Sequence, residues 1–332
     1  MDTIFLITTL IVMFALVFDF INGFHDTANS IATSVSTKAL KPRHAIILAA
    51  TMNFVGALTF TGVAKTITQD IADPFTLPNG SIVILAALIA AITWNLLTWY
   101  YGIPSSSSHA LIGSIAGATI AAAGFGALKW EGFLKIIQAL IISPILAFVV
   151  GFIVYTIIKF TFKNNNLTKT NKQFRGVQIV TAALQSYSHG TNDAQKAMGI
   201  ITMALIANGY TTSTDIPFWV QFSCALAMGL GTSVGGWKII KTVGGKIMKI
   251  RPINGVAADL TGASIIFCAT LIHLPVSTTH VISSSILGVG SAHRVKGVQW
   301  GTAQRMIITW FITLPISATL AGAIYLLLNV FF

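Results

Sequence analysis

The stretch GFHDTAN at residues 23–29 and the stretch GTNDAQK at residues 190–196 are two versions of one polar motif, and each lies inside a long apolar run. Four more blocks recur in the same order, displaced by about 167 to 176 residues, which is typical of an internal duplication. These blocks are Lys65-Thr66-Ile67 with Lys241-Thr242-Val243, Pro78-Asn79-Gly80 with Ile253-Asn254-Gly255, Pro104-Ser105-Ser106-Ser107-Ser108-His109 with Pro275-Val276-Ser277-Thr278-Thr279-His280, and Trp130 and Pro144 with Trp300 and Pro315. The shared order predicts two copies of one structural unit.

The composition places both copies in a membrane. Of 332 residues, 54% are hydrophobic and 9% are charged, whereas soluble domains carry about 25% charged residues. The mean hydropathy is +0.79, and many apolar runs approach or exceed the roughly 20 residues that cross a bilayer as a helix. The ten runs are 3–35, 44–69, 81–101, 104–127, 133–160, 176–207, 217–243, 254–274, 276–292 and 301–332. We therefore expect an all-α integral membrane protein with about 10 to 12 transmembrane or re-entrant helices.

A polar stretch at residues 163–175 divides the chain almost in half. It holds three successive asparagines and several basic residues, a composition typical of a solvated linker. The predicted organisation is a first membrane repeat at 1–160, a cytoplasmic linker at 161–175 and a second membrane repeat at 176–332. Because five segments per copy is an odd number, the second copy should enter the membrane in the opposite direction. This predicts inverted-topology repeats with broken helices near the bilayer midplane.

The basic residues predict the orientation of the chain. With the amino terminus outside, 15 of the 20 Lys and Arg residues fall on the cytoplasmic side and Lys65, Lys129 and Lys135 fall outside, in agreement with the positive-inside rule. The cytoplasmic set is Lys38, Lys41, Arg43, Lys159, Lys163, Lys169, Lys172, Arg175, Lys238, Lys241, Lys246, Lys249, Arg251, Arg294 and Lys296. We expect a multi-pass protein of the cell (inner) membrane with both termini extracellular or periplasmic. Loop charges also explain the net charge of +11, which argues against a nucleic-acid partner.

Acidic residues inside the apolar runs are the first candidates for function. The run 3–35 would form a helix about 50 Å long, too long for a hydrocarbon core of about 30 Å, so we expect a break around its polar cluster. Asp26 and Asp193 require a cation or a proton inside a membrane, and with Asn22 and Asn192 they offer hard oxygen ligands. The alternative is that each aspartate caps the half-helix that follows it.

A hydroxyl cluster follows a proline in each copy, at residues 105–108 and at residues 277–279. Proline favours the first turn of a helix, where free N–H groups and the positive end of the helix dipole attract an anion. Hydroxyl donors at that place predict an oxyanion site. The alternative is that the hydroxyls bond back to helix carbonyls or allow close helix packing.

The buried basic and imidazole groups leave alternatives open. Lys196 stands where the first copy has Asn29, and its side chain is long enough to reach an anion, a neighbouring carboxylate or the membrane interface. The histidines beside the motifs are either proton carriers or neutral rings that bond carbonyls. They are His25, His109, His189 and His280. The spacing of Asp19, Asp259 and Arg305 assigns these residues no role.

The duplicated motifs resemble those of the inorganic phosphate transporter (PiT) family. GFHDTANS at 23–30 and HGTNDAQKAMG at 189–199 look like its first signature, and Pro-x-Ser-[Ser/Thr]-[Ser/Thr]-His in both halves looks like its second. The resemblance covers essentially the whole chain. His25 stands where the family more often has Asn, and Gln195-Lys196 stands where it often has Ala-Asn, departures that look like the prokaryotic branch.

The resemblance implies a secondary active transporter, not an enzyme, that imports inorganic phosphate with co-transported cations by alternating access. Moving a phosphate dianion against 100 mV costs about 5 kcal/mol, which two cations cancel, and the Asp and Asn oxygens favour sodium over protons. The expected phosphate ligands are Ser105, Ser106, Ser107, Ser108, Ser277, Thr278, Thr279, Asn29, Gln195 and Lys196. The expected cation ligands are Asp26, Asp193, Asn22 and Asn192, with sodium at each aspartate. We expect no cofactor beyond these ions, and a homodimer, since dimers are frequent among transporters.

Several other functions remain as alternatives. A proton-coupled or metal-phosphate symporter would use the same site. A sulfate permease differs because phosphate can donate a hydrogen bond to Asp26 or Asp193 and sulfate cannot. An intramembrane metal hydrolase would want a spacing such as H-E-x-x-H, which the sequence lacks, and a passive anion channel needs no duplicated carboxylates. Cys224 and Cys268 have no metal-binding spacing and predict no disulfide framework.

Overall fold

A computed structural model describes residues 3–71, 77 and 79–331. In this part the chain forms thirteen α-helices, two short 3₁₀-helices and no β-strand, which confirms the all-α expectation. The helices of the first half are α1 (Thr3–His25), α2 (Thr27–Ser36), α3 (Pro42–Ala57), α4 (Gly62–Asp70), α5 (Gly80–Tyr101), α6 (Ser107–Ala123), η1 (Phe125–Ala127) and α7 (Trp130–Thr161). Those of the second half are α8 (Leu167–Ala207), α9 (Phe218–Val234), α10 (Trp237–Gly245), α11 (Pro252–Leu271), α12 (Thr278–Arg294), η2 (Val295–Gly297) and α13 (Trp300–Leu328). Pro78, which belongs to one repeated block, lies outside the described residues.

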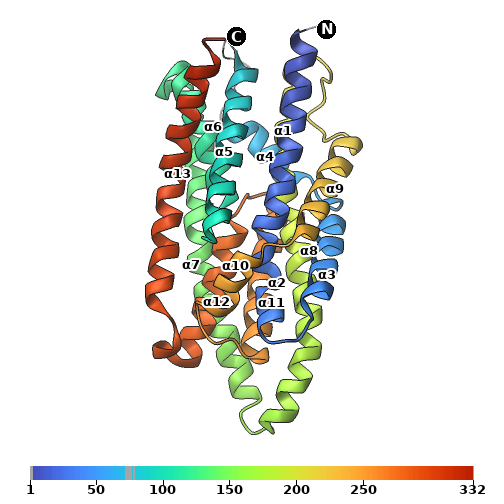
Figure 1. The fold of residues 1–332 in the computed structure, drawn as a ribbon, viewed down its shortest axis with the longest axis vertical. Helices are drawn as coiled ribbons and strands as arrows, with labels where there is room; N and C mark the ends of the chain where they lie inside the picture. The colour runs from blue at the N-terminus through green and yellow to red at the C-terminus, as the bar shows by residue number, and fades with distance from the viewer. Residues whose placement is uncertain (1–2, 72–76, 78, 332) are drawn as a thin grey trace.

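The helices form an elongated bundle whose two termini lie at the same end. The turn between α7 and α8 lies at the opposite end (Figure 1). Helix α1 therefore runs away from the terminal end, whereas α8, which carries the second copy of the motif, runs toward it. The two copies of the motif thus stand on helices of opposite direction.

The apolar runs form both full spans and shorter helices. Within the described residues, five helices are long and apolar enough to cross a membrane, and a sixth span results if α9 and α10, bent by 73° at Gly235–Gly236, count as one. Of the remaining apolar runs, 176–207 lies in α8, which has 41 residues, and the others form shorter helices such as α3 and α6, with 16 and 17 residues. Apolarity alone does not separate a full span from a half-length helix that is buried by its neighbours.

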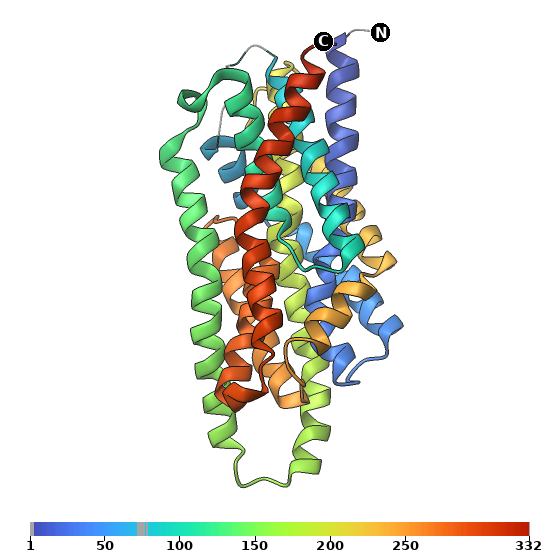
Figure 2. The same cartoon turned by 60° about the vertical axis from the view of Figure 1, so that its left-hand side comes forward.

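Two helical hairpins, α5–α6 and α11–α12, enter the bundle from opposite ends, and their tips lie in its interior (Figures 1 and 2). Gly102, with φ 66°, and His273, with φ 60°, take the left-handed conformation in the two turns. The prolines of the second motif were expected in the first helical turn, which is wrong. Pro104 and Pro275 stand in the turns, three residues before α6 and α12 begin, because Ser106 and Ser277 take the N-cap positions.

The long helix of each half packs on the hairpin of the other half, α7 along α12 and α13 along α6. At the crossings a Cβ atom on Gly117 would lie 2.0 Å from the Ala318 carbonyl oxygen, and one on Gly288 would lie 2.0 Å from the Phe148 carbonyl oxygen. Only glycine permits such contact between two helix backbones. The halves are thereby interlocked.

The first motif interrupts a helix by one residue and the second interrupts none. Asp26 separates α1 from α2 with φ −91° and ψ −32°, values in the helical region, so Ile4–Ser36 still forms one span. Helix α8 continues through Asp193 over 41 residues, so the predicted break in the second copy is wrong. The physical reason is Lys196, which pairs with Asp193 from the next turn of the same helix and neutralises the carboxylate without unwinding.

The predicted linker at 161–175 is also wrong in extent. Only residues 162–166 connect α7 to α8, and residues 167–175 are helical. The Asn166 side chain caps α8 by accepting hydrogen bonds from Thr168 N and Lys169 N, at 3.0 and 3.2 Å. Most described side chains of this stretch are exposed, as expected of a solvated segment. A polar sequence with a good N-cap extends a helix into water as readily as it forms a loop.

Candidate functional site

The Asp26 carboxylate lies at the junction of α1 and α2, 1% exposed, and receives side chains from both hairpins. Ser107 of α6 donates to its Oδ2 at 2.5 Å, and Thr279 of α12 donates to its Oδ1 at 3.0 Å. His25 Nδ1 lies 2.6 Å from Oδ1, and His25 Nε2 lies 3.0 Å from the hydroxyl of Thr98 on α5. Four helices from both halves of the chain therefore meet at one carboxylate.

The Asp193 carboxylate, fully buried in α8, has an ammonium partner, whereas among the described residues Asp26 pairs only with an imidazole. Lys196 Nζ donates to Asp193 Oδ1, and Thr278 Oγ1 donates to Oδ2 at 3.0 Å. His189 Nε2 lies 3.3 Å from Oδ2. Lys196 is itself 0% exposed, so of the three alternatives for this lysine the neighbouring carboxylate is the one observed.

Adjacent threonines at the start of α12 join the two acids. Thr278 bonds Asp193 and Thr279 bonds Asp26, so the carboxylates lie on either side of one helix N-terminus. Asn29 Nδ2 donates to Thr279 Oγ1 at 2.8 Å. The two motifs and both hydroxyl clusters are thus brought to one place inside the bundle.

The hydroxyls predicted to bind an oxyanion divide into two groups. Ser107, Thr278 and Thr279 face the carboxylates. The others bond to hairpin atoms instead. Ser106 and Ser277 accept from His109 N and His280 N as N-caps, and Ser105 donates to Thr98 at 2.9 Å, each within its own hairpin. Ser108 donates to the Val276 carbonyl of the other hairpin at 3.0 Å. The N-cap bonds match the alternative in which the hydroxyls bond to the helix backbone.

The N-termini of α6 and α12 supply a partial positive charge at the site. The backbone N–H groups of Ser107, Ser108, Thr278 and Thr279 belong to first helical turns and have no acceptor within their own helices. The ring centroids of His109 and His280, one turn into each helix, lie 4.5 Å apart, so the two helix starts lie close together. Two helix dipoles with free N–H donors form a place suited to an oxyanion.

The predicted amide ligands differ in their surroundings. Asn192 braces the second hairpin, since its amide donates to Thr270 Oγ1 and the Leu274 carbonyl and accepts from Val276 N. Gln195 accepts from Ala64 N on α4, away from the hydroxyls. Asn22 is fully buried and neither its Oδ1 nor its Nδ2 has a hydrogen-bond partner in the described part of the chain. Asn22 alone of these amides keeps both polar atoms available to a ligand.

A group of unpaired polar atoms near Asn22 was missed by sequence reasoning. Asp19 lies one turn before Asn22 beside the Cys224 thiol, and neither of its oxygens has a hydrogen bond of ordinary geometry within the described residues. Asn95 of α5, one turn before Thr98, is buried with both amide atoms unpaired in the same sense. Because α1 and α5 run in the same direction (Figure 1) and His25 contacts Thr98, Asn22 and Asn95 occupy matching levels of the two helices. The sequence signal that could have identified Asn95 is a single amide side chain in an otherwise apolar run.

Asp259 and Arg305 lie outside this site. The Asp259 carboxylate of α11 accepts from Thr33 Oγ1 at 2.6 Å and Thr181 Oγ1 at 3.2 Å in a separate buried polar cluster. Arg305 is exposed on α13. Among the described residues no three His, Cys, Asp or Glu side chains are grouped to hold a metal ion.

The chain matches the family model described as "Phosphate transporter family" over residues 22–321, which include both motifs and both hairpins. It is 79% identical to a Bacillus subtilis protein named "Probable low-affinity inorganic phosphate transporter", with full coverage of both chains. A Rhizobium meliloti protein of the same name is 46% identical over 94% of this chain and 93% of its own. The solved structure "The sodium-dependent phosphate transporter" superposes with a TM-score of 0.88 at 25% identity, over 98% of this chain and 100% of that chain.

Proposed function

The chain belongs to the phosphate transporter family, and from this premise we propose that it imports inorganic phosphate by cation symport with alternating access, sodium being the favoured cation. The family prediction made from the motifs is confirmed, and the protein is a multi-pass membrane transporter rather than an enzyme. The sodium dependence belongs by name to the structural relative. For this chain, coupling is argued from its own residues.

One observation carries the proposal: two buried carboxylates, one from each half, are joined by hydroxyls at a helix N-terminus. A transporter needs a site that both sides of the membrane can reach in turn, and such sites form between repeats at half-depth. The contacts of Asp26 with both hairpins support this, because relative movement of the hairpins would open the site from either end.

Phosphate is proposed to bind between the N-termini of α6 and α12. The hydroxyls of Ser107, Thr278 and Thr279 now donate to Asp26 and Asp193, and phosphate oxygens would compete for these donors together with the free N–H groups. A protonated phosphate oxygen would donate in turn to a carboxylate. The remaining serines would hold the helix starts in position rather than contact the anion.

The cation is proposed to bind on the Asp26 side, near Asn22. Within the described residues Asp26 has no Lys or Arg partner. Asp19 and Asn22, with unpaired oxygens, lie in the two turns of α1 that precede Asp26, and Asn95 lies at a matching level of α5. Carboxylate and amide oxygens are hard ligands that suit sodium. A buried carboxylate without a cation is costly inside a membrane, so loading of this side with a cation would favour closure of the site.

Lys196 is proposed to act as a fixed cation at Asp193. Its ammonium occupies the place beside Asp193 Oδ1 where a second coupling ion would sit, so the sodium expected at Asp193 does not enter the proposal. One mobile cation then moves with each monovalent phosphate. Such a cycle carries no net charge, and the membrane potential, worth about 2.3 kcal/mol per charge per 100 mV, would not drive it.

The opposite directions of α1 and α8 support inverted repeats as the basis of alternating access. The 15 basic residues assigned to the inside include those of the α7–α8 turn and of the loops at the same end. We propose that this end is cytoplasmic and that both termini are external. We further propose that the repeats extend over 1–161 and 167–332, since α7 ends at Thr161 and α8 begins at Leu167.

Uptake of labelled phosphate into proteoliposomes, with sodium and proton gradients imposed separately, tests the proposal. We expect a sodium gradient to drive accumulation and a proton gradient alone to drive little. Accumulation with only a proton gradient would assign the coupling to protons. Equilibration that ignores both gradients would indicate a passive channel, and equal inhibition by sulfate would indicate a less selective anion carrier.

A further inference from the structure

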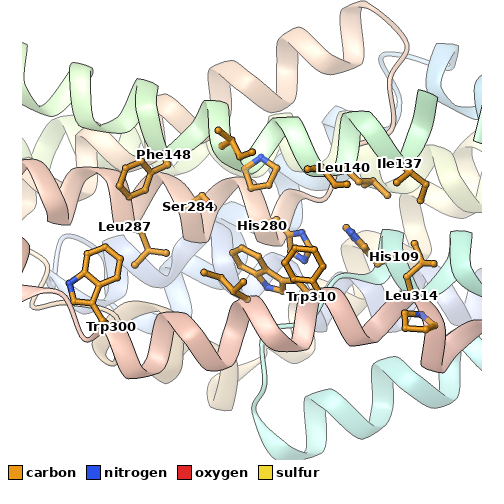
Figure 3. Close-up of a pocket in the computed structure, with 16 residues that line it drawn as sticks. His109, Ile137, Leu140, Phe148, His280, Ser284, Leu287, Trp300, Trp310 and Leu314 are labelled. Carbon is orange, nitrogen blue, oxygen red and sulfur yellow. The ribbon is translucent and has the colours of Figure 1, made fainter. Parts of the chain in front are cut away.

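An apolar groove opens between α7 and α13, behind the two hairpins. The groove has a volume of about 530 Å³, and the two long helices form its walls while α6 and α12 form its floor (Figure 3). His280 lies on the floor near the middle of the groove, His109 lies further toward Leu314, and Trp300 marks the opposite end. It is separate from the polar site, which lies on the far side of the N-caps Ser106 and Ser277.

The groove faces the lipid. The side chains of Ile145 on α7 and Phe311 on α13 line it and are 60% and 71% exposed. Both walls belong to full-length apolar spans, so an opening between them meets acyl chains rather than water. Both walls carry a helix proline in the lining, Pro144 on α7 and Pro315 on α13.

The length of the groove suits one acyl chain. Its lining runs along α13 from Trp300 to Pro315, which corresponds to about 22 Å of helix. One leaflet of the hydrocarbon core is about 15 Å thick. A chain whose head lies level with Trp300 therefore reaches the histidines at the floor, and tryptophan is typical of the headgroup level.

The charges around the Trp300 end determine the kind of head group. Arg294, Lys296 and Arg305 surround Trp300 in the sequence and are exposed. No Asp or Glu occurs between residues 260 and 332, or in α7 after Glu131. A cluster of cations without carboxylates at the membrane surface attracts anionic rather than zwitterionic lipid.

We propose that this groove binds one acyl chain of an anionic phospholipid, with its head group at Trp300 among Arg294, Lys296 and Arg305. The tip of the chain packs against the ring of Trp310, which stacks on His280 with centroids 4.1 Å apart and donates from Nε1 to the Pro104 carbonyl at 3.3 Å. Trp310 thereby links the tips of both hairpins. The acyl chain thus packs against the side of the two hairpins that faces away from the polar site.

The test uses the full-length protein in nanodiscs that contain phosphatidylglycerol or phosphatidylcholine with a photoreactive group at the end of one acyl chain. We expect phosphatidylglycerol to label groove residues of α7 and α13 near residues 141–148 and 307–314. Ile145→Trp fills the groove and should abolish that labelling. Ile153→Trp is the matched control, two turns further along α7, 50% exposed and outside the groove.

Removing the cations tests the head group separately. Arg294→Gln and Lys296→Gln should each lower phosphatidylglycerol labelling by about fivefold and leave phosphatidylcholine labelling unchanged. Equal labelling around the whole lipid-facing surface, or full labelling of Ile145→Trp, would overturn the proposal. Crosslinking of Ile145→Cys between two copies of the chain would instead assign the groove to a dimer contact. Labelling does not require transport, so these results stand whether or not uptake is sodium-coupled.

Discussion

At the scale of single residues, the two motif aspartates have different surroundings despite their shared origin. Asp193 is neutralised by Lys196, whereas Asp26 is surrounded by hydroxyls and an imidazole. The difference arises from one position, Asn29 in the first copy and Lys196 in the second. The duplicated site is therefore asymmetric in charge, and the two acids should respond differently to substitution.

Asp26→Asn should abolish coupled uptake and leave the fold intact. The substitution removes the charge that attracts the cation while an amide retains one acceptor for Ser107 or Thr279. We expect sodium-driven uptake in proteoliposomes to fall by at least about a hundredfold, since a buried charge pair is worth several kcal/mol. Elution as a monodisperse peak is the folding control, and full sodium-driven uptake in this variant would contradict the assignment.

Lys196→Asn should add one cation to the transport cycle. Without its ammonium, Asp193 requires a mobile cation, so uptake should become steeper in sodium concentration and should respond to an imposed membrane potential. Lys196→Arg keeps the charge and serves as the matched control, with uptake insensitive to the potential. Loss of phosphate binding in Lys196→Asn, with binding kept in Lys196→Arg, would instead make this lysine a phosphate ligand.

The sequence predicted which acids and hydroxyls meet, but not which hydroxyl contacts which group. Duplication and intramembrane charge identify Asp26, Asp193 and the serine clusters without coordinates. Whether a serine caps a helix or faces a carboxylate depends on its position in the first turn, which changes with a shift of one residue. Ser106 and Ser107 are neighbours with different roles for this reason.

At the scale of elements, helix crossings depend on glycines that the sequence did not single out. Gly117 and Gly288 are equivalent positions where α6 meets α13 and α12 meets α7. Periodicity predicted the helices, but half-length hairpins and full spans have similar hydropathy, so apolarity did not show which runs are full spans. A lone polar stretch was likewise read as a linker although it continues α8.

Gly117→Ala should destabilise the protein by about 1 to 3 kcal/mol, because the added methyl group would lie 2.0 Å from the Ala318 carbonyl oxygen and force α13 outward. Thermal unfolding of the detergent-solubilised protein measures the effect as a lower midpoint. Gly176→Ala in α8 is the control, since nothing lies within 4 Å of its new Cβ. It should be neutral or slightly stabilising. Equal unfolding midpoints for the two variants would show that α6 and α13 can move apart at this crossing without loss of stability.

At the scale of the whole molecule, the ends of the bundle can be assigned by labelling. In a background with Cys268 replaced by Ser, a membrane-impermeant thiol reagent applied to intact cells should label Gly126→Cys and not Asn165→Cys. Opening the cells should expose the second site. Both positions are exposed. Gly126 belongs to the α6–α7 connection and Asn165 to the α7–α8 turn, and these two connections lie at opposite ends of α7 (Figure 1). The reverse pattern would place the termini inside and contradict the charge argument.

Helix α8 links the α7–α8 turn, at the end of the bundle away from the termini, directly to the Asp193–Lys196 pair. From Leu167 to Asp193 the helix is uninterrupted over about 39 Å, so a tilt of the helix at the turn would displace the ion pair. A nanobody bound to this turn should therefore slow phosphate transport without contacting the buried site.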